Sequence, residues 1–339
     1  MATAMLETLA KARVLGKSPV GACLRLNDWI WRRLPRWFAA LPPVGSYGRF
    51  LHTLARLHTE REMLLGTFFF RNRPELELIR RLSETVAGRR PVRIAVLGCS
   101  NGAEVYSIRS TLRSLRPDAQ LVLNAVDISS KAVECARDGI YSRGVSDLVR
   151  EPVCALMTAE EVAAMFDAEG ERLSIKPWLK EGVTWRIGDA ADPLVRDALG
   201  LQDIVIANRF LCHMAPPDAE RCLRSVARLV APGGYLFVSG VDLDVRTRVA
   251  ADLGWMPVPE LLEDIHDGDR TLRGDWPCKY WGLEPLDKRR PDWAVRYASA
   301  FQIGRAAEAG GSEHARAAGE RPSPPSGSGR RDAAVKRRR

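Results

Sequence analysis

Carboxylates and glycines stand at the ends of three apolar runs in this sequence. Val92–Leu97 leads into Gly98, with Glu104 shortly after it, and two later runs end at Asp127 and Asp189. Glycine lets a backbone approach a ligand closely, and a carboxylate after a strand can accept hydrogen bonds from both hydroxyls of a ribose. Each feature alone is equally typical of a turn or a helix cap. In combination they favour an adenosine-binding site.

The glycine loop narrows the class of ligand. It contains only Gly98 and Gly102, so it lacks the three-glycine fingerprint of dinucleotide-binding enzymes. A nicotinamide-dependent oxidoreductase is therefore disfavoured. Ser129 and Ser130 follow Asp127 and can cap the next helix, which leaves the Asp127 carboxylate to a ligand.

The elements that must position these residues alternate between strand and helix patterns. Continuous apolar runs separated by helices indicate a parallel sheet that is covered on both faces. The expected fold is a Rossmann-like α/β domain with a mostly parallel sheet. The expected strands are Val92–Leu97, Leu121–Val126, Val183–Ile187, Asp203–Ile206 and Tyr235–Val238. The expected helices are Ala103–Leu115, Ser130–Arg137 and Asp218–Leu229, the last leading into a turn at Pro232-Gly233-Gly234.

Several ordered motifs resemble the CheR family of chemotaxis-receptor methyltransferases over about residues 63–240. They are Thr67-Phe68-Phe69-Phe70-Arg71, Gly98 through Ser107, Asp127-Ile128-Ser129, Ala136 through Tyr141, Met157 through Phe166 to Asp189, and Asp203 through Phe210. The resemblance implies a class I methyltransferase fold preceded by a short helical subdomain. It also implies S-adenosylmethionine as the cofactor and a protein glutamate as one possible acceptor.

The resemblance assigns roles to individual residues. Arg71 stands where the family has an arginine at its reaction centre, and a guanidinium there could orient a carboxylate bidentately. The alternative for Arg71 is a plain surface arginine. Thr67 and Arg71 would contact the cofactor, Gly98 would form the loop, Glu104 would hold the amino group, Asp127 the ribose, and Asp189, Ala190, Asn208 and Arg209 the adenosine walls.

The chain departs from the family pattern near its acceptor site. Asn208 and Arg209 reverse the usual order, His213 replaces a tyrosine, and Leu65 replaces an asparagine. His213 could act as a base for a hydroxyl, thiol or amine acceptor, could position the substrate, or could be a core or capping residue. The methyl acceptor therefore stays open between a carboxylate and another group. A non-catalytic regulatory protein that binds S-adenosylmethionine is the alternative function.

Charge and cysteine usage exclude other classes. Residues 1–45 and 304–339 each carry five more basic than acidic side chains, so the middle of the chain is close to neutral. A nucleic-acid-binding enzyme would carry its positive charge on the folded domain, so no nucleic-acid partner is expected. The seven cysteines form no C-x-x-C pair, which predicts no disulfide framework, no metal site and a cytoplasmic location.

Three regions are expected along the chain. Residues 1–62 form a helical segment broken at prolines, residues 63–303 the methyltransferase domain, and residues 304–339 a disordered basic tail. No run approaches the roughly 18 apolar residues of a membrane span. The tryptophans of the first region, Trp29, Trp31 and Trp37, could touch a membrane surface weakly together with neighbouring arginines, but packing on the domain is preferred. The aromatic segment 276–285 is expected to form closing strands, which pack the sheet edge or line an acceptor pocket.

Overall fold

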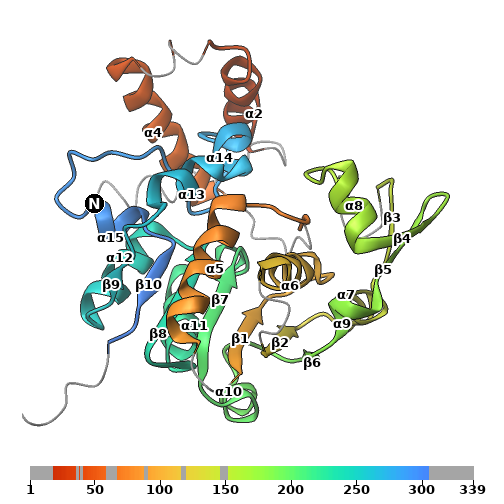
Figure 1. Ribbon diagram of the computed structural model, residues 1–339. Helices are drawn as coiled ribbons and strands as arrows, with labels where there is room; N and C mark the ends of the chain where they lie inside the picture. Colours follow the sequence, from red (N-terminus) through yellow and green to blue (C-terminus); the bar gives the residue numbers. More distant parts are fainter. Residues whose placement is uncertain are drawn as a thin grey trace, which may run out of the picture. The chain divides into compact units, whose positions relative to one another are not determined.

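The computed structural model describes residues 18–35, 38, 41–58, 67–87, 91–115, 120–145 and 152–304. Trp37, Leu65 and the predicted tail from residue 305 lie outside the described residues. The elements are labelled as in Figure 1.

A seven-stranded sheet runs through the domain in the order β6-β2-β1-β7-β8-β10-β9. The first five strands in this order pair in parallel, and β10 is antiparallel to both of its neighbours. This order is Rossmann-like, so the predicted fold class is confirmed. The strands are β1 (Val92–Leu97), β2 (Leu121–Asp127), β6 (Val183–Ile187), β7 (Gln202–Asn208), β8 (Val230–Ser239), β9 (Met256–Pro257) and β10 (Ala300–Gln302).

Helices cover both faces of the sheet (Figure 1). Side chains of α5 and α6 pack on one face, and those of α10, α11 and α12 pack on the other. Alternate strand residues serve the two cores, as Ile94 and Ala95 show. The helices of the domain are α5 (Arg73–Val86), α6 (Ala103–Leu115), α7 (Ser130–Asp138), α9 (Pro177–Lys180), α10 (Pro193–Leu199), η1 (Leu211–His213), α11 (Pro216–Ala227), α12 (Leu243–Asp252), α13 (Leu262–Gly268), α14 (Arg270–Asp275) and α15 (Trp293–Tyr297).

A small antiparallel sheet, which the sequence analysis did not predict, stands beside the main one (Figure 1). It consists of β3 (Ile140–Ser142), β5 (Arg172–Ile175) and β4 (Phe166–Glu169) in that order, next to helix α8 (Ala159–Met165). Edge-on contacts of Phe69 with Tyr141 and Phe166, at 5.2 and 5.1 Å between ring centroids, join it to the domain. Strands of three or four residues are too short to show a period-2 pattern, which explains the omission.

Two predictions for the closing part of the sheet are wrong. Segment 276–285 forms no strand, since prolines there cannot donate to a ladder and Gly282 adopts a left-handed φ of 67°. Short strands β9 and β10 close the sheet instead. The expected turn Pro232-Gly233-Gly234 lies inside β8, where the pairing with β7 shifts register between Gln202 and Ile204.

The helical front end packs on the domain through α2 (Pro19–Trp31) and α4 (Pro42–His58). Trp31 meets Trp276 edge-on at 5.2 Å, as the packing interpretation predicts. Trp29 does not follow that interpretation, because it is 56% exposed and lies under the Arg33 guanidinium at 4.0 Å.

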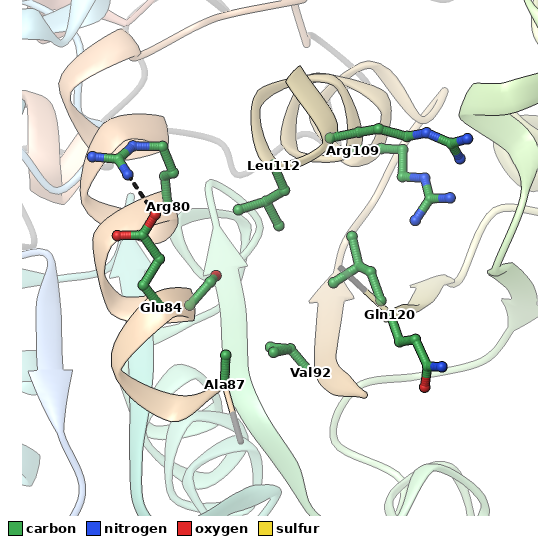
Figure 2. Close-up of a pocket in the computed structure, with 10 residues that line it drawn as sticks. Arg80, Glu84, Ala87, Val92, Arg109, Leu112 and Gln120 are labelled. Atoms are coloured by element: carbon green, nitrogen blue, oxygen red, sulfur yellow. Dashed lines mark hydrogen bonds and ion pairs between the residues drawn. The ribbon is translucent and has the colours of Figure 1, made fainter. Parts of the chain in front are cut away.

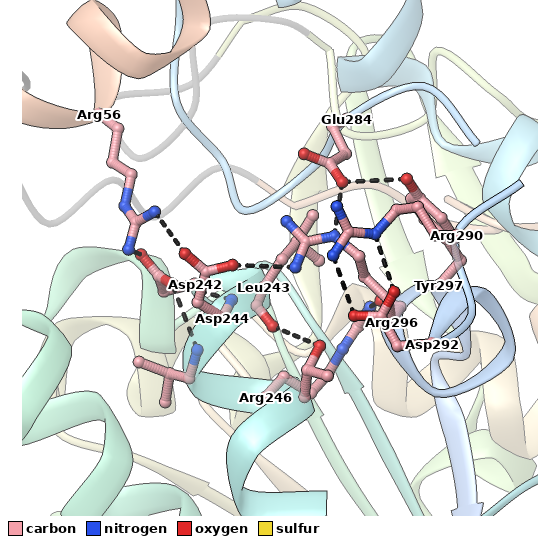
Figure 3. A network of polar contacts seen from close by, with 12 residues as sticks. Arg56, Asp242, Leu243, Asp244, Arg246, Glu284, Arg290, Asp292, Arg296 and Tyr297 are labelled. Carbon is pink, nitrogen blue, oxygen red and sulfur yellow. Dashed lines mark hydrogen bonds and ion pairs between the residues drawn. The ribbon is translucent and has the colours of Figure 1, made fainter. Parts of the chain in front are cut away.

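A network of ion pairs also holds α4 to the domain (Figure 3). Arg56 of α4 reaches the buried Asp242 at 2.7 Å and the neighbouring Asp244 at 2.8 Å. Arg296 of α15 binds the other oxygen of Asp244 at 2.9 Å and Glu284 at 2.6 Å. Because each carboxylate serves partners from distant parts of the chain, the start of α12 is fixed from two sides.

Candidate functional site

The loop after β1 brings its backbone to the carboxyl ends of the strands. Gly98, Ser100 and Gly102 all have left-handed φ, at 69°, 49° and 84°. A Cβ at Gly98 would stand 2.9 Å from the Phe210 ring, so only glycine fits there. The loop then opens α6, whose first turn carries Glu104.

Asp127, at the end of β2, holds this loop with both carboxylate oxygens. Oδ2 accepts the Ser100 N–H at 2.7 Å, and Oδ1 accepts the Ser129 N–H at 2.9 Å. The Ser129 hydroxyl caps α7 by accepting the Ala132 N–H, so capping is indeed left to a serine. An ionised carboxylate offers about four acceptor positions, which leaves two of them for a ribose.

The Thr67–Arg71 segment lies against the start of α6. The Phe70 N–H donates to the Ser107 hydroxyl at 3.0 Å, and Phe69 is fully buried. Phe70 itself has a left-handed φ of 51°. These anchors set the direction of Arg71, whose guanidinium lies 5.8 Å from the Phe68 ring.

A cluster of buried charges forms where α5, α6 and β7 meet. The Asn208 side-chain amide donates to Glu75 at 2.5 Å and to Glu104 at 2.8 Å, and its Oδ1 accepts the Ser239 hydroxyl at 2.8 Å. Arg209 has a left-handed φ of 64° and forms an ion pair with Asp269. Because Asn208 stands before Arg209 in this chain, an amide lies between the carboxylates of Glu75 and Glu104.

Burial shifts the ionisation of this cluster. Burial, followed by the Glu104 charge, raises the pKa of Glu75 to about 7. Burial also raises the pKa of Glu104, against the opposing effects of Asn208 and Arg71. Burial lowers the pKa of Arg71, and burial together with Arg71 lowers the pKa of Arg209 to about 10. With these pKa values, Arg209 is charged at neutral pH, whereas the Glu75 carboxyl group changes between its protonated and ionised forms near neutral pH.

The remaining predicted residues lie further along the strand ends. Asp189 follows β6 and is exposed, and its Oδ1 accepts the Ala191 N–H at 2.8 Å, so it also forms a turn. His213 ends the short helix η1, and its ring meets Trp281 edge-on at 6.2 Å.

All ten predicted site residues line one pocket, which we call the strand-end pocket. It encloses about 1050 Å³ of empty space, part of which is open to solvent. Its size and its mixture of apolar walls with a few polar groups are those of a small-molecule site. Its lining is Thr67, Arg71, Gly98, Ser100, Glu104, Val126, Asp127, Ile128, Gly188, Asp189, Ala190, Asn208, Arg209, Phe210, His213 and Met214.

These residues fit S-adenosylmethionine. Position 98 admits no Cβ, and Asp127 keeps acceptor positions for a ribose. Glu104 offers a carboxylate for an amino group, and apolar side chains such as Ile128 and Phe210 offer surfaces for an adenine. The role of each individual residue remains a prediction.

Comparison with known families decides the assignment. Residues 66–244, more than half of the chain, match the model of the CheR methyltransferase S-adenosylmethionine-binding domain.

The chain belongs to the CheR methyltransferase family.

Relatives of this CheR-family protein include a probable biofilm formation methyltransferase, WspC, of Pseudomonas putida, which is 30% identical over 54% of this chain and 42% of the relative. A chemotaxis protein methyltransferase of Vibrio parahaemolyticus is 27% identical over 48% of this chain and 58% of the relative. The chain thus spans about half the length of these relatives. The solved magnesium protoporphyrin IX methyltransferase of Synechocystis with bound SAM is 16% identical, over 55% of this chain and 71% of that one, with a TM-score of 0.32.

Sequence reasoning did not find three polar residues of the buried cluster beside the strand-end pocket. Glu75 occupies the third position of α5 behind the Asn72 cap, where an acidic residue is ordinary helix chemistry. Ser239 and Asp269 lie outside any motif. Only Glu75 carried a signal, since it follows the Thr67–Arg71 motif closely.

A second cavity lies at the opposite ends of the strands from the candidate site (Figure 2). It encloses about 490 Å³ of empty space beside Val92 and Leu121, where β1 and β2 begin. Ligands of such folds bind at the carboxyl ends of the strands, so this cavity is separate from the candidate site.

Among the helices that the structure describes, none is long and apolar enough to span a membrane.

Proposed function

We propose that this protein is an S-adenosylmethionine-dependent methyltransferase that methylates a carboxylate, with a protein glutamate as the first candidate. The pair of arginines in the wall of the strand-end pocket carries the proposal. Arg71 and Arg209 both line it beside Glu104. The Arg209 Nε is buried and has no hydrogen-bond partner among the described residues. Two guanidinium groups at one wall suit a carboxylate better than a hydroxyl or an amine.

The main contribution of the protein to methyl transfer is to position the two reactants. The cofactor supplies an electrophilic methyl group on a sulfonium. When bound, it would supply this methyl to an acceptor oxygen, and the electron pair of the C–S bond would stay on sulfur. A carboxylate is already a nucleophile and needs no base, so Arg71 and Arg209 would orient it while the surrounding walls exclude water.

The proposal also includes the class of acceptor and the cellular location. The name of the Vibrio parahaemolyticus relative, a chemotaxis protein methyltransferase, favours a protein acceptor. The seven cysteines, all of them free thiols in the structure, agree with a cytoplasmic location.

The test is transfer of radiolabelled methyl from S-adenosylmethionine into a cell lysate, with products sorted by size and by lability to mild base. Label on protein that mild base releases as methanol is the expected result, because methyl esters hydrolyse. Base-stable label would instead indicate a hydroxyl, amine or thiol acceptor. Label on a small molecule would remove the protein glutamate from the proposal.

A regulatory protein that binds the cofactor without turnover is the second candidate. It is favoured by the departures at the acceptor side, where Asn208 and Arg209 are reversed and His213 replaces a tyrosine. Cofactor binding with no labelled product would establish this alternative.

A further inference from the structure

We propose that Glu75 is a positioning residue for cofactor binding, which acts through the Asn208 amide on the Glu104 carboxylate. The inference rests on the proposed function, because Glu104 matters here as the group that receives the amino group of the cofactor.

The Asn208 side chain is fixed in one orientation. Both hydrogens of its amide are used, one on Glu75 and one on Glu104, and its oxygen accepts the Ser239 hydroxyl. Turning the amide over would place its oxygen against two carboxylates and lose all three hydrogen bonds. A change at Glu75 is therefore transmitted to Glu104 through a rigid amide.

Glu75 can influence the cofactor only through this amide and through its charge. The described residues that line the strand-end pocket include Glu104 but not Glu75. Glu75 is 6% exposed, and its N–H donates to the Asn72 Oδ1 at 3.3 Å. Asn72 in turn donates to the Ile265 carbonyl at 2.7 Å, so the first turn of α5 is held in place.

The two carboxylates also share a charge balance. Because burial and the Glu104 charge raise the pKa of Glu75 to about 7, Glu75 carries a proton below that pH. Loss of that proton at higher pH adds a second negative charge near the bound ammonium. Cofactor affinity should therefore rise as pH increases through 7. The other charged or titratable groups in the cavities that Glu75 lines are Arg71, Glu104, Arg209, Arg246, His266, Asp269, Glu284 and Tyr297.

The experiment compares Glu75→Gln with the wild type by calorimetry with S-adenosylhomocysteine from pH 5.5 to 8.5. Glutamine keeps an oxygen for the Asn208 amide but carries no charge. The ratio of the two dissociation constants cancels the ionisation of the ligand. We expect the dissociation constant of Glu75→Gln, divided by that of the wild type, to be about 1 at pH 5.5. At pH 8.5 this ratio should be about 5 to 10, because the variant lacks the negative charge of Glu75, whose effect is taken at an intermediate dielectric constant. Glu77→Gln, two residues along the same helix and paired with surface arginines, should give a ratio of about 1 throughout.

Two further measurements separate positioning from a structural effect. In a Glu104→Gln background, the effect of Glu75→Gln should differ from its effect in the wild type, because the part that passes through the Asn208 amide to Glu104 is absent and only the direct attraction of the Glu75 charge remains. Wild-type protein should release a fraction of a proton on binding at pH 7, measured in buffers of different ionisation enthalpy, even if Glu75→Gln does not fold. A pH-independent ratio or no proton release would overturn this inference alone. Failure of the wild type to bind S-adenosylhomocysteine would instead overturn the proposed function.

Discussion

Replacing Asp127 with alanine tests the ribose assignment, and the structure indicates two separate consequences. Asp127 is 6% exposed and lines the strand-end pocket, so the substitution removes its acceptor positions for a ribose. The same carboxylate also accepts the N–H groups of Ser100 and Ser129. The variant therefore loses part of the ligand site and the anchor of the glycine loop.

The two consequences have different magnitudes. Two hydrogen bonds from hydroxyls to an ionised acceptor, less the water that replaces them, contribute about 2–3 kcal/mol to binding. This corresponds to a dissociation constant about 30- to 150-fold higher. Leaving two backbone donors without Asp127 should lower the free energy of unfolding by about 1–3 kcal/mol, toward the lower value because water can enter the pocket.

Calorimetry with S-adenosylhomocysteine and thermal denaturation measure these two effects separately. Asp127→Asn is the matched control, since its amide oxygen can still accept the Ser100 N–H. It should recover much of the stability while binding stays weak. A folded Asp127→Ala protein with a dissociation constant within twofold of the wild type would remove Asp127 from the ribose site.

Three other predictions concern the acceptor, the tail and the helical front end. If the acceptor is a carboxylate, Arg71→Lys should lower turnover strongly, and His213→Asn should have only a mild effect on turnover. If the acceptor is a hydroxyl or an amine, His213→Asn should instead lower turnover by about 100-fold and remove an acidic limb from the pH–rate profile. Truncation after Gly304 should leave the melting temperature and cofactor binding unchanged, and a clear drop would show that the tail packs on the domain. Gly48→Ala should reduce stability by about 1–3 kcal/mol, because its Cβ would lie 2.4 Å from a tryptophan ring. Gly274→Ala, in helix α14 with nothing within 4 Å of its Cβ, should be neutral or slightly stabilising in the same melting experiment.

The sequence by itself determined the five parallel strands of the main sheet and the residues that line the strand-end pocket. Val92–Leu97 and Val183–Ile187 are strands with the bounds that their apolar runs predict. Parallel strands present their carboxyl ends at one edge, so residues that follow the strands must meet there. Asp127 and Asn208 could therefore be assigned to one site although 81 positions separate them in the chain.

Only the tertiary structure decided which carboxylates share the buried cluster. Glu75 looks like an ordinary first-turn residue of a helix, and its partner Asn208 lies 133 positions away. Asp269, which follows α13 and belongs to no motif, likewise pairs with Arg209, 60 positions earlier in the chain. Ionisation follows burial and the distances between charges, and both depend on how α5, α6 and β7 pack. A local pattern of residues contains neither quantity, which is why the raised pKa of Glu75 emerges only from the folded chain.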